Sequence, residues 1–200
     1  MRVAVLTVDQ RGSTKLAATD RVPDTLAGLA DLGLLRAFER TAGDEFQGVL
    51  DDPAVVTAAV ERLLREDAWN IGLGIGPVEE PLPDSARAGR GPAYLHARAA
   101  VTGAKSAPWR LRVVGDDVGV RPLETALWLW AYVLGRRTSR GWEVADLVEA
   151  GASYDEAAQR LGITPSAVSQ RAQAAGLVEA GRARELVTDL VGGLLHDRGP

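Results

Sequence analysis

Along the first 115 residues, segments with the hydrophobic pattern of β-strands alternate with segments that have the spacing of amphipathic helices. Val3 to Val8 is almost continuously apolar and β-branched, which predicts a buried central strand. Residues 35–41 and 45–50 alternate on either side of Gly43-Asp44, which is the pattern of a β-hairpin. Other segments complete the series: helices over 23–32 and 53–66, a strand over 69–75, a helix opening at Gly91, and a strand over 110–114.

The resulting order is β-α-β-β-α-β-α-β, which predicts an α+β fold. Paired helices on one face of a mainly antiparallel sheet make a ferredoxin-like palm. In that arrangement the first strand and the hairpin can be neighbours. Gly72, Gly74 and Gly76 alternate within the strand over 69–75 and beyond. Such spacing indicates that a backbone or a ligand approaches one face of the strand closely.

Candidate chemistry gathers where the first strand ends and where the hairpin turns. Asp9 closes the strand, and Asp44 and Glu45 lie at the hairpin tip. Neighbouring carboxylates suit Mg²⁺, which prefers oxygen ligands and phosphate groups. The loop after Asp9 adds Gly12, Ser13 and Thr14, a composition suited to cradling a phosphate. The alternative is that Asp9 only turns the chain, and that Asp44 and Glu45 only shape the hairpin.

The pattern becomes purely helical after about residue 118. Residues 123–134 carry Trp128, Trp130 and Tyr132 with apolar groups around most of the helix, which predicts burial between domains or in a dimer interface. A second helix is expected over 142–150. Residues 181–184 are interpreted as the start of a wing or a contact, and residues 185–195 as a terminal helix suited to dimerisation.

Residues 153–176 are similar to a helix-turn-helix. Ser153 with Glu156 forms a capping box, Gly162 supplies the turn, and Thr164 caps a helix that starts at Pro165. The second helix of such a unit enters the major groove of DNA. The predicted DNA-binding residues are base readers, phosphate contacts and the cap: Arg160, Thr164, Ser166, Ser169, Gln170, Arg171 and Gln173. The alternative is a protein-binding module or a degenerate relic of such a unit.

Composition narrows the functional classes. The 200-residue chain has a formal net charge of −4, so any contact with DNA has to be local. It has no cysteine, which excludes disulfides and thiolate chemistry, and its two histidines, His96 and His196, make a histidine metal site improbable. A signal peptide and an apolar run of about 20 residues are both absent from the sequence. The expectation is a soluble, cytoplasmic protein that does not enter membranes.

The first 115 residues or so resemble the SatD family. The resemblance rests on residues 9–14, Gly43-Asp44, residues 71–78 and residues 91–98. More distantly, this part is similar to the palm of class III nucleotide cyclases and GGDEF-type diguanylate cyclases. Gly, Asp and Pro residues between Gly115 and Pro122 predict a domain boundary. The expected domains are a cyclase-like palm over 1–118 and an all-α domain with the helix-turn-helix over 119–200.

The cyclase resemblance also implies roles for individual residues. Asp9 and Asp44 would hold two metal ions, and Arg98 matches a helix arginine that acts on the transition state. Tyr94 stands where cyclases have an asparagine, and no lysine is placed to recognise a purine. Loss of one positioned donor costs roughly 2.7–4 kcal/mol of barrier, so efficient cyclisation is disfavoured.

The leading hypothesis is therefore a homodimeric DNA-binding regulator. Its palm would sense a nucleotide through Gly12, Ser13, Thr14 and Arg98, would bind Mg²⁺ through Asp9, Asp44 and Glu45, or would simply dimerise. The alternative hypothesis is a divergent metal-dependent nucleotide cyclase or other phosphoryl-transfer enzyme. A third is a palm that serves as a scaffold for protein interaction. The sequence assigns no catalytic residue.

Overall fold

The computed structural model describes residues 1–12 and 19–196, which form a mixed α+β fold with one five-stranded sheet and eight α-helices. The strands are β1 (Arg2–Gln10), β2 (Arg36–Ala42), β3 (Glu45–Leu50), β4 (Trp69–Pro77) and β5 (Leu111–Val114). The helices are α1 (Val22–Leu29), α2 (Pro53–Glu66), α3 (Pro92–Ala104), α4 (Val120–Leu134), α5 (Ser139–Glu149), α6 (Tyr154–Leu161), α7 (Pro165–Ala174) and α8 (Leu177–Leu195).

The sheet has the order β2-β3-β1-β4-β5, with β1 in the centre. Neighbouring strands are antiparallel except β4 and β5, which are parallel. The predicted buried strand is confirmed, because Val3 to Leu6 and Val8 are fully buried. The predicted hairpin is confirmed too: β2 and β3 meet at Gly43, whose φ of 59° suits glycine.

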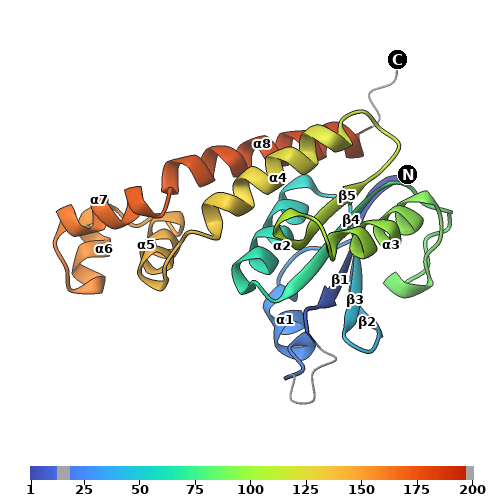
Figure 1. Ribbon diagram of the computed structural model, residues 1–200, viewed down its shortest axis with the longest axis horizontal. Helices are drawn as coiled ribbons and strands as arrows, with labels where there is room; N and C mark the ends of the chain where they lie inside the picture. The colour runs from blue at the N-terminus through green and yellow to red at the C-terminus, as the bar shows by residue number, and fades with distance from the viewer. Residues whose placement is uncertain (13–18, 197–200) are drawn as a thin grey trace.

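Helices cover both faces of the sheet (Figure 1). Residues of α1, α2, α4 and α8 share the main hydrophobic core with one face, whereas α3 packs against the other face. The close approach predicted from the β4 glycines is explained by the backbone of α3. A Cβ atom on Gly74 would lie 2.1 Å from the amide nitrogen of Ala97, and one on Gly72 would lie 2.2 Å from that of Val101.

Helices α4 and α8 run side by side, away from the sheet and back to it (Figure 1). Leu127 and Trp130 of α4 and Val191 of α8 are part of the main core. Within the single chain α4 is buried on one side only, because Leu129 is 65% exposed and Tyr132 is 51% exposed. Burial of these side chains in a dimer interface stays a prediction. The helix is amphipathic, with one side on α8 and the sheet.

Helix α8 is longer than predicted and begins at Leu177. Residues 181–184 are therefore part of a continuous helix, and the interpretation of this segment as the start of a wing is wrong. Arg184 instead binds Glu61 of α2 at 2.7 Å and Glu149 of α5 at 2.8 Å. This arginine joins three helices that are distant in sequence.

Helices α5, α6 and α7 form a small cluster at the far end of the α4–α8 pair, which we call the distal cluster (Figure 1). The cluster has its own core of small apolar side chains: Val144, Ala157, Ala158, Val168 and Ala172. Both predicted helices over 153–176 are present, and the capping box of Ser153 and Glu156 is formed. No helix among residues 1–12 and 19–196 has the length and apolarity needed to cross a bilayer.

Candidate functional site

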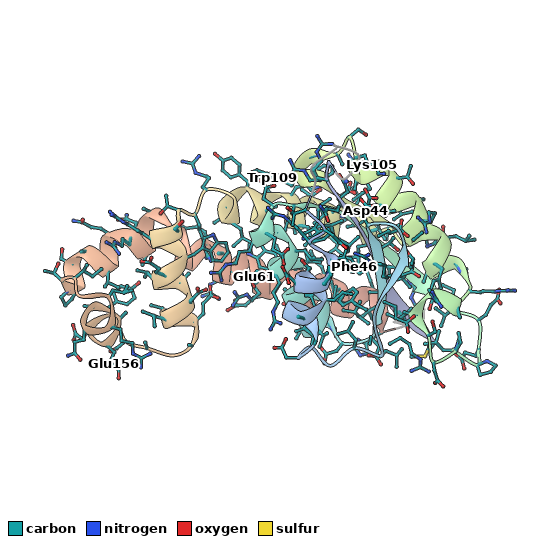
Figure 2. All side chains as sticks on the ribbon, turned by 90° about the horizontal axis from the view of Figure 1, so that it is seen from below. Asp44, Phe46, Glu61, Lys105, Trp109 and Glu156 are labelled. Atoms are coloured by element: carbon teal, nitrogen blue, oxygen red, sulfur yellow. The ribbon has the colours of Figure 1, made fainter. Side chains whose placement is uncertain are left out.

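A polar pocket of about 880 Å³ opens where β1 ends, beside the turn between β2 and β3. Figure 2 shows two of its lining residues, Asp44 and Lys105, at the same end of the sheet. The charged lining is balanced between four carboxylates (Asp9, Asp44, Glu66 and Asp67) and four cations (Arg11, Arg21, Lys105 and Arg110). We call this cavity the sheet-end pocket.

Asp9 owes its place to the register of the central strands. It lies opposite Glu45 on β3 and Asn70 on β4, so the three side chains project from the face that α3 covers. The Asn70 amide donates a hydrogen bond to Asp9 Oδ2 at 3.0 Å. Lys105 Nζ lies 3.2 Å from the same oxygen. The charge of Asp9 is therefore compensated within the chain.

Glu45 is paired even more completely. Arg98 of α3 donates from both terminal nitrogens to the two carboxylate oxygens, with Nη2 at 2.8 Å from Oε1. The Thr41 hydroxyl donates to the same Oε1 at 2.7 Å. The side chain of Glu45 is only 12% exposed, and Glu45 is not among the described residues that line the pocket. Arg98, the predicted nucleotide-binding arginine, is thus held against a carboxylate.

Asp44 differs from the other two predicted carboxylates. Its Oδ2 is buried and has no hydrogen-bond partner among the described residues. Its backbone carbonyl accepts a hydrogen bond from the Gln10 amide at 3.2 Å, which fixes the turn against the end of β1. Buried acceptors normally find a donor. Asp44 is therefore the member of the predicted trio best placed to meet a ligand in the pocket.

Of the predicted phosphate loop, Gly12 lines the pocket, while Ser13 and Thr14 lie outside the described residues. The cations beside Gly12 differ in how far they are engaged. Arg11 is paired with Asp67 at 2.6 Å, whereas Arg21 and Arg110 make no ion pair within residues 1–12 and 19–196. Arg110 has a φ of 51°, a left-handed conformation that is unfavourable for a long side chain.

Eight polar residues that line this pocket were not among the predicted site residues: Gln10, Arg11, Arg21, Glu66, Asp67, Asn70, Lys105 and Arg110. A signal for one of them existed. Lys105 follows Arg98 by seven positions, which is about two helical turns, so the two residues share a face. Asn70, Arg21 and Arg110 carried no such signal, because strand register and loop geometry bring them to Asp9.

The donor set fits a divalent metal poorly as it stands. Asp9 and Asp44 line the same pocket, but Asp9 would have to give up Lys105 to bind a cation, and Glu45 would have to give up Arg98. No group of three or more His, Asp or Glu side chains among the described residues is placed to hold a metal ion. The Mg²⁺ site over Asp9, Asp44 and Glu45 stays a prediction.

The predicted DNA-binding residues lie on the distal cluster. Thr164 caps α7, since its hydroxyl accepts a hydrogen bond from the Ala167 amide at 3.2 Å. Arg171 is half-buried and lies 3.9 Å from Glu143 of α5. The other predicted residues are exposed to solvent, as Thr164 is: Arg160, Ser166, Ser169, Gln170 and Gln173. Six of the seven side chains are thus accessible to a partner.

Comparison with known proteins adds little. No family model matches the chain, and no curated protein matches it. Among solved structures, the chain is similar to a regulator of polyketide synthase expression from Bifidobacterium adolescentis, with 13% identity. The match covers 100% of this chain and 83% of that one, with a TM-score of 0.29. A TM-score this low supports no inference about fold or function.

Proposed function

We propose that the protein is a DNA-binding regulator. In this proposal α6, the turn at Gly162 and α7 form a helix-turn-helix, and residues 1–118 form a ferredoxin-like, cyclase-like palm that binds an anionic ligand. The single observation that carries it is the row of exposed polar side chains on α7, which includes Ser166, Ser169, Gln170 and Gln173.

The local chemistry of the distal cluster supports this proposal. The sequence contains no acidic residue from 157 to 178, whereas the whole chain carries a net charge of −4. Residues 157–178 therefore add no carboxylate that would repel the DNA phosphates. The cluster also lies at the tip of the α4–α8 pair, and Figure 2 shows Glu156 far from the labelled residues of the sheet end. A duplex can reach α7 there without meeting the sheet.

The exposed residues of α7 have the chemistry that base readout requires. Glutamine can bond adenine through two hydrogen bonds, and serine can reach a phosphate or a base edge. Ser166 and Gln170 are one helical turn apart, so they point from the same side of α7. Arg160 of α6 is exposed and would contact phosphate, while Arg171 is shared with Glu143. A dimer would read two half-sites, and dimerisation stays a prediction.

The test is selection of binding sequences from a random duplex library, followed by titration of the selected duplex. We expect the double change Ser166→Ala, Gln170→Ala to weaken binding to that duplex roughly 10- to 100-fold, because a good base contact discriminates by about 1–3 kcal/mol. Arg160→Ala should weaken binding to all duplexes alike and reduce the salt dependence. Gln159→Ala, an exposed change on α6, serves as the matched control. Binding that is indifferent to the double change would contradict the proposal.

The sheet-end pocket is proposed to bind an anion such as the phosphates of a nucleotide. Support comes from Arg21 and Arg110, which line the pocket without an ion-pair partner among the described residues. Titration with ATP and GTP, followed by the melting temperature, should show stabilisation that Arg110→Ala reduces. Arg87→Ala, a change at an arginine that does not line the pocket, is the control. No shift with any nucleotide would remove the sensory part of the proposal.

The second candidate function is a divergent metal-dependent phosphoryl-transfer enzyme. The observation that favours it is that Asp9 and Asp44 line one pocket together with Lys105 and Arg110. Turnover of ATP or GTP in Mg²⁺ or Mn²⁺ that disappears in Asp44→Asn would support this function. Turnover that survives Asp44→Asn, or no turnover at all, would rule out this mechanism.

A further inference from the structure

Two cavities adjoin at the end of the sheet where β4 and β5 begin. The first is the sheet-end pocket, of about 880 Å³. The second, which we call the junction cavity, measures about 230 Å³, roughly the liquid volume of eight water molecules. Asp67 lines both cavities, while the consecutive residues Trp109 and Arg110 line the junction cavity and the sheet-end pocket, respectively. A ligand larger than one phosphate group would therefore meet both cavities.

The backbone is strained at the border between the two cavities. Among residues 1–12 and 19–196, only three non-glycine residues have a positive φ: Asp67 at 46°, Trp109 at 55° and Arg110 at 51°. These are the three residues that form the border. A left-handed backbone is unfavourable for residues other than glycine, and such strain is concentrated at active sites and ligand clamps. The border is therefore a candidate binding site.

Trp109 presents an aromatic surface at this border. The residue is 41% exposed, and Figure 2 shows it on the same side of the molecule as Lys105 of the sheet-end pocket. Its ring meets that of Tyr132 edge to face, with the centroids 6.1 Å apart. Gly135 makes room for the indole, since a Cβ atom there would lie 2.6 Å from its Cζ3 atom. An exposed indole held in this way is preorganised for stacking, because little side-chain freedom is left to lose on binding.

The charges at the border would orient a phosphorylated ligand. Arg21 and Arg110 line the sheet-end pocket without an ion-pair partner among the described residues. The side chain of Asp67 is 87% exposed, and only its Oδ1 is paired, with Arg11 at 2.6 Å. Because like charges repel and opposite charges attract, phosphates would lie at Arg21 and Arg110, on the side away from Asp67.

The arginines that line the junction cavity do not offer a second phosphate site. Arg65 donates two hydrogen bonds to Asp146, at 2.6 and 2.8 Å. The side chain of Arg137 has 0% exposure, so it is out of reach of a ligand. Leu64 and Trp142 add half-buried apolar surface to the lining. The junction cavity therefore suits a flat, uncharged group better than an anion.

We propose that the two cavities form one nucleotide site, with the phosphates at Arg110 and Arg21 and the base stacked on Trp109 in the junction cavity. This inference rests on the anion site proposed above for the sheet-end pocket, and it adds the chemical class of the ligand. Every nucleobase has a π face on which an indole can stack. Because Trp109 and Arg110 are consecutive, one short segment would hold both the base and the phosphates.

A base in the junction cavity would contact the root of the distal cluster. The cavity is lined by Leu134 and Gly135 at the end of α4 and by Trp142 of α5. The guanidinium of Arg65 on α2 lies 4.3 Å from the centroid of the Trp142 ring, so this indole also joins α5 to the helices on the sheet. Occupancy would therefore change the packing between the sheet and α5. A phosphate confined to the sheet-end pocket has no such route to α7.

The test compares nucleotides with inorganic tripolyphosphate, which carries at least as much negative charge as ATP but has no base. Isothermal titration calorimetry of the full chain, in buffer without divalent metal ions, gives the dissociation constants of ATP, GTP, CTP, UTP and tripolyphosphate. We expect at least one nucleotide to bind about fivefold more tightly than tripolyphosphate or better, because stacking on one aromatic side chain contributes a factor of roughly 5 to 150. Tripolyphosphate that binds as tightly as every nucleotide would overturn the inference and leave the proposed anion site intact.

Two variants and a matched control locate the base. Trp109→Ala should weaken nucleotide binding roughly 5- to 150-fold and leave tripolyphosphate binding unchanged, and Trp109→Phe should restore part of the loss. Gly135→Ala displaces the indole without removing it and should have the same selective effect. It also keeps the inference testable if Trp109→Ala fails to fold. Tyr154→Ala, at an aromatic residue of α6 that is 38% exposed, is the control and should bind both compounds as the native protein does.

The outcomes separate this inference from the proposed function. A loss in both variants that is selective for nucleotides supports the inference, whether or not the protein binds DNA. An equal loss of nucleotide and tripolyphosphate binding would show that Trp109 only holds Arg110 in place, and undiminished nucleotide binding in both variants would place the base elsewhere. Either result overturns the inference while the anion site stands, whereas no binding of any of these compounds would remove both.

The effect on DNA tests the route through the junction cavity and rests on the proposed function. In a protein that binds the selected duplex, the nucleotide should shift the affinity for this duplex more than tripolyphosphate does. Trp109→Ala should make the two shifts equal. Equal shifts in the native protein would contradict the route from the base to α7.

Discussion

The sheet-end pocket and the distal cluster use their polar side chains in opposite ways. At the sheet end, charges are paired inside the molecule by partners far apart in sequence: Asp9 and Asn70 are 61 positions apart, and Glu45 and Arg98 are 53 apart. In α6 and α7 of the distal cluster, the helix caps are local, as in the box of Ser153 and Glu156, three positions apart. The polar side chains of α7 face solvent, except Arg171, which is half-buried beside Glu143.

This difference predicts different costs of recognition. A ligand in the sheet-end pocket has to compete with ion pairs such as Asp9 with Lys105, so a cation gains little there. An anion gains most from Arg21 and Arg110, which have no ion-pair partner among the described residues. A partner of α7 displaces only water, because local caps already hold the helix. The first site is stabilised before a ligand arrives, and the second is preorganised for contact.

The largest loss of stability is expected from a substitution that disrupts the packing beneath the sheet-end pocket. Gly74→Ala places a Cβ atom 2.1 Å from the Ala97 amide nitrogen, so α3 has to move away from β4 and carries Arg98 and Lys105 with it. Overpacking of a core costs typically 1–3 kcal/mol and occasionally more, and we expect a loss of about 3 kcal/mol of unfolding free energy in urea denaturation. The matched control is Gly181→Ala in α8, where a Cβ meets nothing within 4 Å and the helix should gain up to about 1 kcal/mol. A loss below about 1 kcal/mol for Gly74→Ala would show that α3 is not rigidly seated.

An intermediate effect tests whether the sheet-end charges are truly paired. Arg98→Met leaves Glu45, which is 12% exposed, without its main partner. We expect a loss of about 1–2 kcal/mol, since a largely buried acceptor loses its donors while the exposed half of the pair is screened by solvent. Glu45→Gln and the double variant complete a mutant cycle in urea. Additive effects of the two changes would show that the pair contributes nothing and would weaken the contrast with the distal cluster.

The smallest effect concerns the local caps of the distal cluster. Ser153→Ala removes the N-cap of α6 and should cost about 1 kcal/mol. The hydrogen bond from the Ser153 backbone, and then the one from its side chain, hold the pKa of Glu156 below its usual value. A carboxyl whose pKa is lowered on folding contributes stability above its unfolded pKa, and this contribution is lost as the pH falls through the lowered pKa.

The stability of α6 at acidic pH tests this role of Glu156. As the pH falls below the usual range of a glutamate, α6 should lose less helicity in Glu156→Gln than in the native protein. The helicity is measured from the backbone amide resonances of α6. Glu185→Gln on the exposed side of α8 is the control and should leave those resonances unchanged. An acid limb in α6 that is the same in Glu156→Gln and in the native protein would assign the pH dependence to other carboxylates.

Local sequence signals predicted most elements but little of the site. The hairpin around Gly43, the helix over 53–66 and the two helices over 153–176 were each predicted from patterns within about 25 residues, and all are present. Asp9 and Asp44 were predicted to lie near each other, and they line one pocket. Their neutralising partners could not be predicted from spacing alone, because strand register and the placement of α3 decide which cation meets which carboxylate.

The sequence by itself determined the periods, caps and turns of this protein, because those depend on neighbours a few positions apart. The glycines of β4 also predicted that another segment approaches this strand closely, although only the structure shows that this segment is α3. Tertiary structure alone decided that Arg98 is bound to Glu45, and that Arg137 is buried with no hydrogen-bond partner among the described residues for two of its nitrogens. The physical reason is that the energy of a charge depends on burial and on partners from distant segments, and neither is encoded at the charge's own position in the chain.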